Sequence, residues 1–105
     1  MHLSAAEFKQ WKDEQRPHLL IDIRENYEIE HCSIGGLPIV MEKIISQCAQ
    51  FPIDQAIVIH CNSGKRSDAV VYALRQRLNR SDIYSLDGGI QNYAVQFEPH
   101  LNCAS

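Results

Sequence analysis

The stretch from residue 56 to residue 78 constrains the fold of this 105-residue chain more than any other. It opens with Ala56–His60 (AIVIH), a short apolar run of the kind that forms a strand buried on both faces. After a loop at residues 61–66, a helical pattern covers residues 67–78, with Val70, Leu74 and Leu78 on one stripe. A buried strand that leads through a short loop into an amphipathic helix predicts a parallel sheet with helical crossovers.

The remaining segments continue this alternation of strands and helices. Ser4 and Glu7 have the spacing of a capping box, and they predict a helix that ends before Pro17. Further strands are predicted at residues 18–23, 37–40 and 83–86, a helical turn at 25–30, helices at 41–50 and 90–97, and a turn at 87–89. The sequence therefore predicts an α/β fold with a small central parallel sheet of four to five strands and helices on both faces.

Length and composition limit the organisation of the protein. A chain of 105 residues has a common size for one compact domain, so residues 1–105 are expected to form a single domain. Neither an apolar run of membrane-spanning length nor a signal-peptide pattern is present, so we expect a cytoplasmic protein without a membrane partner. The net charge of -3 argues against a nucleic-acid partner.

The chain has four cysteines, Cys32, Cys48, Cys61 and Cys103. In a cytoplasmic protein they are expected to be reduced thiols rather than a disulfide framework. No pair has the spacing typical of a zinc site, so neither a metal nor another cofactor is expected. Cys48 lies on the apolar stripe of its predicted helix and is predicted to be core, whereas Cys103 is a candidate for a resolving or accessory thiol.

Cys61 stands at the carboxyl end of the best predicted strand, where ligands bind in parallel α/β sheets. Gly64 lets the loop curl, so that successive N–H groups and the start of the following helix can surround an anion, while Lys65 and Arg66 add positive charge. These features favour a thiolate over a thiol. The residues predicted to form the substrate-binding loop are Asn62, Ser63, Gly64, Lys65, Arg66 and Ser67.

A thiolate in such a loop can take a sulfane sulfur from a small anionic donor, such as thiosulfate or a persulfide, and pass it to a second nucleophile. The sequence thus predicts covalent catalysis in two half-reactions, with Cys61 as the persulfide carrier. The plain alternative is that Cys61 is a small buried hydrophobic residue at a strand end. Another alternative is a binding or regulatory module that keeps the fold without turnover.

Three segments resemble the rhodanese-like family, in the order and spacing of that family. They are LLIDIRENYEIE, similar to its early D-x-R-E segment, IVIHCNSGKRSDAVVYAL, similar to its active-site strand, loop and helix, and YSLDGGIQNYA, similar to its L-x-G-G-I segment. The resemblance implies a rhodanese-like fold and a sulfurtransferase of the thiosulfate sulfurtransferase type. Within the family, the chain is similar to the small modules of adenylyltransferases that activate sulfur carriers in molybdopterin and thiamine synthesis. This similarity implies a sulfur-carrier protein, or its adenylyltransferase, as a partner.

Asp22 and Arg24 end the first long strand, at the same edge of the sheet as the Cys61 loop (residues 61–66). From the residues alone they form a surface ion pair, worth about 0–1 kcal/mol. The resemblance implies instead that they support the loop. The chain departs from the family pattern at residues 33–37 (SIGGL), at Asn62, where arginine is frequent, and at Tyr93, where tryptophan is frequent. Of these departures, Asn62 is the one that affects the predicted sulfur transfer, because it follows the nucleophile directly.

Other chemistries fit this loop less well than sulfur transfer. A cysteine-dependent phosphatase has a loop one residue longer, whereas here residues 62–65 alone separate Cys61 from Arg66, which favours sulfur over a phosphoryl group. A nucleotide-binding loop would need a glycine where Ile59 stands. A dyad of Cys61 with His60 is disfavoured because neighbours on a strand point to opposite faces.

Overall fold

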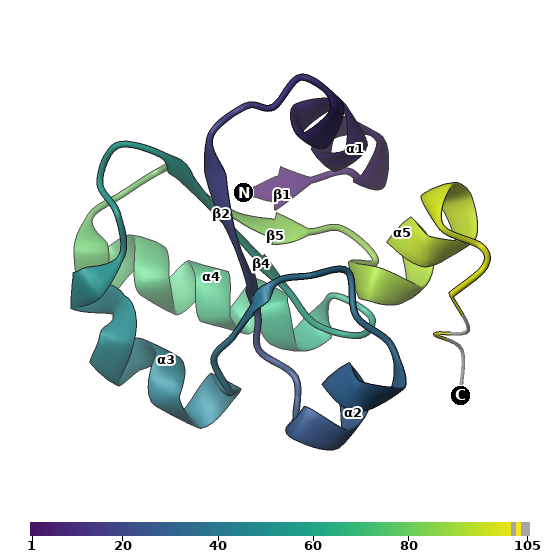
Figure 1. The fold of residues 1–105 in the computed structure, drawn as a ribbon. Helices are drawn as coiled ribbons and strands as arrows, with labels where there is room; N and C mark the ends of the chain where they lie inside the picture. Colours follow the sequence, from purple (N-terminus) through teal and green to yellow (C-terminus); the bar gives the residue numbers. More distant parts are fainter. Residues whose placement is uncertain (102, 104–105) are drawn as a thin grey trace.

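Ala56–His60 forms β4, the central strand of a five-stranded parallel sheet, in the computed structural model, which describes residues 1–101 and 103 (Figure 1). The sheet has the order β1-β5-β4-β2-β3, and each neighbouring pair of strands is parallel. The other strands are β1 (His2–Leu3), β2 (His18–Asp22), β3 (Leu37–Pro38) and β5 (Ile83–Leu86). The predicted α/β class and the parallel sheet are confirmed.

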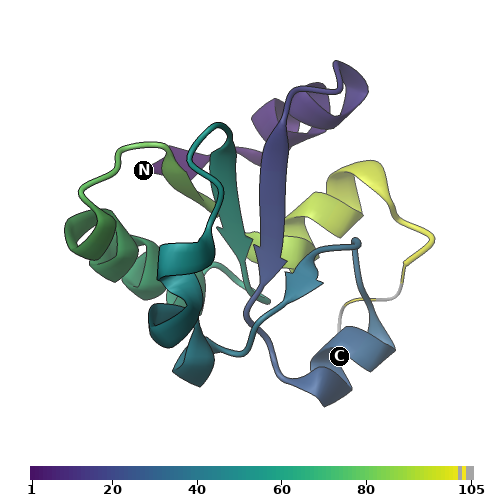
Figure 2. The same ribbon diagram turned by 60° about the vertical axis from the view of Figure 1, so that its left-hand side comes forward.

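Helices cover both faces of this sheet, as predicted (Figures 1 and 2). They are α1 (Ala5–Asp13), α2 (Asn26–His31), α3 (Met41–Gln47), the 3₁₀ helix η1 (Cys48–Gln50), α4 (Lys65–Leu78) and α5 (Gly89–Phe97). Side chains of α1 and α5 pack on one face of the sheet, and those of α3 and α4 pack on the other. The short helix α2 follows the carboxyl end of β2 and buries none of its residues.

The central strand explains why the apolar run is continuous. Ile57 and Ile59 join the cluster beneath α3 and α4, whereas Ala56 and Val58 join the cluster beneath α1 and α5. Because successive side chains of a strand point to opposite faces, a strand between two helical layers needs apolar residues at every position. Each large aliphatic side chain buried in this way stabilises the fold by about 1.5–3 kcal/mol.

Several boundaries differ from the prediction for local reasons. The strand expected at residues 37–40 is limited to Leu37–Pro38, an exposed strand at the edge of the sheet, where a proline is tolerated. The edge strand His2–Leu3 was not predicted, since two residues carry no periodic pattern. The long helix begins at Lys65 rather than at residue 67, because its N-cap Gly64 adopts φ +102° and turns the chain early.

The cysteines correct one expectation. Cys32, which follows α2, and Cys103 are joined by a disulfide with a Cα–Cα distance of 5.4 Å. The prediction of reduced thiols is therefore wrong for this pair, which lies 71 residues apart in sequence and leaves no local signal. Cys48 and Cys61 carry free thiols. Cys48 is 3% exposed in the core, as predicted.

The described part of the chain contains neither a helix that could cross a membrane nor a group of metal ligands. Within residues 1–101 and 103, every helix falls short of the length and apolar character that crossing a membrane requires. The same residues contain no cluster of three or more histidine, cysteine or acidic side chains arranged to hold a metal ion.

Candidate active site

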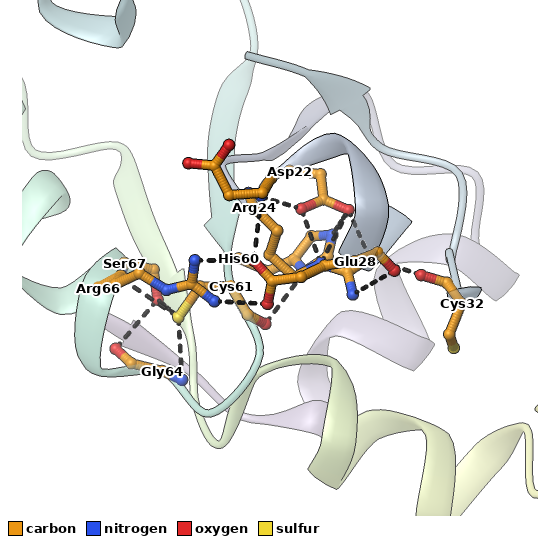
Figure 3. A network of polar contacts seen from close by, with 10 residues as sticks. Asp22, Arg24, Glu28, Cys32, His60, Cys61, Gly64, Arg66 and Ser67 are labelled. Atoms are coloured by element: carbon orange, nitrogen blue, oxygen red, sulfur yellow. Dashed lines mark hydrogen bonds and ion pairs between the residues drawn. The ribbon is translucent and has the colours of Figure 1, made fainter. Parts of the chain in front are cut away.

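Cys61 follows β4 directly, and the loop after it folds back around its sulfur (Figure 3). The residue is 1% exposed, and Sγ accepts hydrogen bonds from the N–H of Gly64 at 3.1 Å and from the N–H of Ser67 at 3.4 Å. Two backbone N–H groups at the start of α4 thus point at the sulfur. Such donors stabilise negative charge on a thiolate or a persulfide.

The turn after β5 fixes the other side of the loop. Gly88 and Gly89 adopt φ +77° and +64°, and the chain leaving them donates hydrogen bonds from Ile90 N to Cys61 O (3.0 Å) and from Gln91 N to Asn62 O (3.2 Å). A Cβ atom on Gly89 would lie 2.6 Å from Cys61 O and even closer to Asn62. The segment predicted to be a turn therefore also holds the backbone of the Cys61 loop in place.

Asp22 and Arg24 form a buried pair instead of a surface pair. Their side chains are 0% and 3% exposed, and the guanidinium donates to both carboxylate oxygens, with Nε–Oδ1 at 2.9 Å and Nη2–Oδ2 at 2.8 Å. Arg24 Nη2 also donates to the carbonyl of Cys32 at 2.6 Å, and the N–H of Ile23 donates to the carbonyl of His60 at 3.1 Å. The interpretation as a surface ion pair is wrong, since these contacts join β2, β4 and the end of α2 beneath the loop.

His60 turns toward this pair. Its Nε2 lies 3.4 Å from Asp22 Oδ2, and its ring is fully buried. Burial lowers the pKa of His60, because the charged imidazolium loses its hydration, although the nearby Asp22 opposes this effect. A buried imidazole directed at Asp22 fits the predicted packing role of His60.

Glu28 on α2 was not predicted as a site residue. Its carboxylate accepts two hydrogen bonds from the Arg66 guanidinium, with Nη1–Oε1 at 3.0 Å and Nη2–Oε2 at 2.9 Å (Figure 3). These bonds hold the pKa of Glu28 below its ordinary value. The positive charge predicted for Arg66 is therefore balanced by a carboxylate, while Lys65 stays exposed.

A cavity of about 300 Å³ adjoins the loop. Its lining comes from α2 and the residues around it, from the loop and from the C-terminal segment, namely Arg24, Tyr27, Glu28, His31, Asn62 and Cys103. Asn62, which lines this cavity, is the residue that follows Cys61 in the chain. Of the predicted loop residues, Gly64 and Ser67 contact the sulfur, Asn62 lines the cavity, and Ser63 is exposed.

Comparisons with known proteins show the family of the chain. Residues 4–96 match the family model described as "Rhodanese-like domain". The chain is 29% identical over 102 residues to "Probable adenylyltransferase/sulfurtransferase MoeZ" of Mycobacterium tuberculosis, covering 94% of this chain and 26% of that protein. The chain thus spans about a quarter of the length of that relative.

Two further proteins are similar over most of their own length. The chain is 37% identical over 78 residues to "Sulfurtransferase" of Allochromatium vinosum, covering 72% of this chain and 71% of that protein. The crystal structure of a rhodanese-related protein from Thermoplasma volcanium superposes with a TM-score of 0.79 at 24% identity, covering 91% of this chain and 92% of the other. That superposition concerns the fold alone.

Proposed function

Because this chain belongs to the rhodanese-like domain family, we propose that it is a sulfurtransferase that carries sulfane sulfur on Cys61 as a persulfide. The observation that supports this role is the hydrogen bonding of Sγ by two backbone N–H groups at the start of α4. A buried cysteine with a purely structural role has no need of such donors, whereas a thiolate and a persulfide anion both do.

The reaction proceeds in two displacements. The Cys61 thiolate attacks the outer sulfur of thiosulfate, an S–S bond forms on the enzyme, and sulfite leaves with the electrons of the broken bond. A nucleophilic acceptor such as cyanide then attacks the outer sulfur of the persulfide and leaves as thiocyanate, which restores the thiolate. The N–H groups of Gly64 and Ser67 lie at Sγ, the atom that carries the negative charge of the thiolate before the first displacement and after the second.

The cavity beside Asn62 is the proposed entry for donor and acceptor. Glu28 neutralises the charge of Arg66, whereas Lys65 is exposed. A small anionic donor that approaches the loop is therefore attracted mainly by the charge of Lys65. The similarity to MoeZ, whose name joins an adenylyltransferase to a sulfurtransferase, supports a sulfur-carrier protein or its adenylyltransferase as the partner.

The test is thiocyanate production from thiosulfate and cyanide. The wild-type protein is expected to turn over, and Cys61→Ser is expected to be inactive, because an alkoxide does not form a persulfide. Cys48→Ser is the matched control, since it removes the other free thiol. If the wild-type protein is inert with thiosulfate and with persulfide donors, the protein is a non-catalytic binding module and the proposal is refuted. Release of phosphate from an aryl phosphate would instead indicate a phosphatase.

A further inference from the structure

A chain of hydrogen bonds leads from the Cys61 sulfur to the surface. Sγ lies 3.6 Å from Ser67 Oγ, and Ser67 Oγ lies 2.7 Å from Ser85 Oγ. Ser85 Oγ donates to Asp68 Oδ1 at 2.6 Å, and His2 Nε2 lies 3.1 Å from the same carboxylate oxygen. The four links join α4, β5 and β1 in one continuous path.

The path runs from the interior to solvent. Ser67 and Ser85 are fully buried and Cys61 is 1% exposed, whereas the side chains of Asp68 and His2 are 44% and 52% exposed. Buried hydroxyl groups are unfavourable unless they form hydrogen bonds. Here the two hydroxyls are linked to each other, one of them next to the nucleophile and the other next to an exposed carboxylate, and this placement points to a role in chemistry.

The hydrogen bonds of this path allow all of its hydrogen atoms to point the same way. An ionised Asp68 only accepts, so the single hydrogen of Ser85 points at it. The single hydrogen of Ser67 can point at the carbonyl of Gly64, at 3.1 Å, or at Ser85 Oγ, and the S–H of Cys61 donates to Ser67. With the Ser67 hydrogen on Ser85, every donor along the path points from the thiol toward the carboxylate.

We propose that Ser67, Ser85 and Asp68 form a proton relay through which the Cys61 thiol is deprotonated, an inference that rests on the proposed sulfurtransferase function. The thiol proton passes to Ser67 Oγ, the hydrogen of Ser67 passes to Ser85 Oγ, and that of Ser85 passes to Asp68. Three bonds to hydrogen break and three form, and no atom is oxidised or reduced. The exposed Asp68 then releases the proton to water. Ser67 touches the reacting sulfur and is catalytic, whereas Ser85 and Asp68 are positioning residues.

The relay has two consequences at the sulfur. A donor molecule in contact with Sγ covers what little of Cys61 is exposed, and the relay then carries the proton away through the protein. After the transfer, the Ser67 hydroxyl has its hydrogen on the sulfur side, and it adds a third donor to the N–H groups of Gly64 and Ser67. Loss of the proton and stabilisation of the thiolate are thereby coupled.

The experiment measures persulfide formation in a single turnover, with thiosulfate as the donor, by rapid quench and intact-protein mass spectrometry. Asp68→Asn and Ser85→Ala are expected to slow this step by about tenfold or more. Asp13→Asn is the matched control, because Asp13 is another exposed carboxylate in an ion pair, and it should keep the wild-type rate. Asp68→Glu should retain most of the rate.

A small base in the buffer distinguishes a relay from a structural role. Formate or imidazole should restore the rate of Asp68→Asn, whose lost proton acceptor lies at the surface, but not that of Ser85→Ala, whose gap is buried. Wild-type rates in both variants, or slow variants that neither buffer base nor Asp68→Glu restores, would overturn the relay and leave the sulfurtransferase proposal standing. A wild-type protein that forms no persulfide with thiosulfate or a persulfide donor would refute the proposed function, and the relay with it.

Discussion

Replacing Gly89 by alanine tests whether the turn after β5 positions the Cys61 loop. Gly89 has φ +64°, and a Cβ atom there would lie 2.6 Å from Cys61 O, inside van der Waals contact with backbone that cannot rotate away. A left-handed conformation costs a residue with a side chain about 1–2 kcal/mol. Displacing packed backbone adds about 1–3 kcal/mol. The sum predicts a loss of about 2–5 kcal/mol in the free energy of unfolding.

Gly35→Ala provides a matched control. Gly35 has φ +92°, but a Cβ atom on it would meet nothing within 4 Å, so the substitution brings backbone strain without a clash. The free energy of unfolding, measured in urea, should therefore be lower for Gly89→Ala than for Gly35→Ala by the cost of the clash alone, about 1–3 kcal/mol.

Activity separates the two variants more strongly. Relief of the clash at Gly89 must move Cys61 O or lengthen the 3.0 Å hydrogen bond from Ile90 N, and either shift displaces the sulfur from its N–H donors. A displacement near 1 Å can cost about 10²-fold in rate. Thiocyanate production should fall on that scale in Gly89→Ala and stay near wild type in Gly35→Ala. Equal stability losses together with equal activities would refute the role of the turn.

Three further predictions concern the framework of the site. Arg24→Met should lower the free energy of unfolding by about 3–5 kcal/mol, because it leaves the fully buried Asp22 carboxylate without its partner. Cys103→Ser should cost about 4 kcal/mol, because the bond to Cys32 closes a loop with a sequence separation of 71. Burial lowers the pKa of His60 below its ordinary 6.5, so the unfolded chain binds the proton more readily, and stability should fall as the pH drops below 6.5 toward the folded-state pKa.

Each of these predictions has its own control, read by urea unfolding. Lys9→Met breaks the exposed ion pair with Asp13 and should change stability by about 0–1 kcal/mol, and a cost as large as that of Arg24→Met would contradict the importance of burial. Under reducing conditions, wild type and Cys103→Ser should become equally stable, and a persistent gap would exclude the disulfide as its cause. His60→Gln should flatten the dependence on pH below 6.5, whereas an unchanged slope would assign it to other groups.

The local patterns of the sequence predicted the fold well where periodicity was long. The run Ala56–His60 and the stripe of Val70, Leu74 and Leu78 specified the central strand and its following helix, because a strand between two helical layers and a helix on one layer impose different periods. The placement of Cys61 followed from the same pattern, since parallel strands end at one edge of the sheet.

The partners of the site depend on contacts between distant segments and have no local signal. Glu28 reaches Arg66 across 38 residues, and Ser85 reaches Ser67 across 18. Neither spacing repeats, and each side chain alone is typical of an exposed or packed residue. The burial of Asp22 with Arg24 likewise could not be predicted from the sequence. Two charged residues at a strand end give the same local pattern whether solvent or the end of a helix covers them.

The most direct test of the central claim is intact-protein mass spectrometry after exposure to a sulfur donor, followed by peptide mapping. The account predicts a gain of one sulfur atom on Cys61, removable by a thiol reductant and absent from Cys61→Ser. A protein that gains no sulfur from thiosulfate or a persulfide, or that carries it equally in Cys61→Ser, would contradict the assignment of Cys61 as the sulfur carrier.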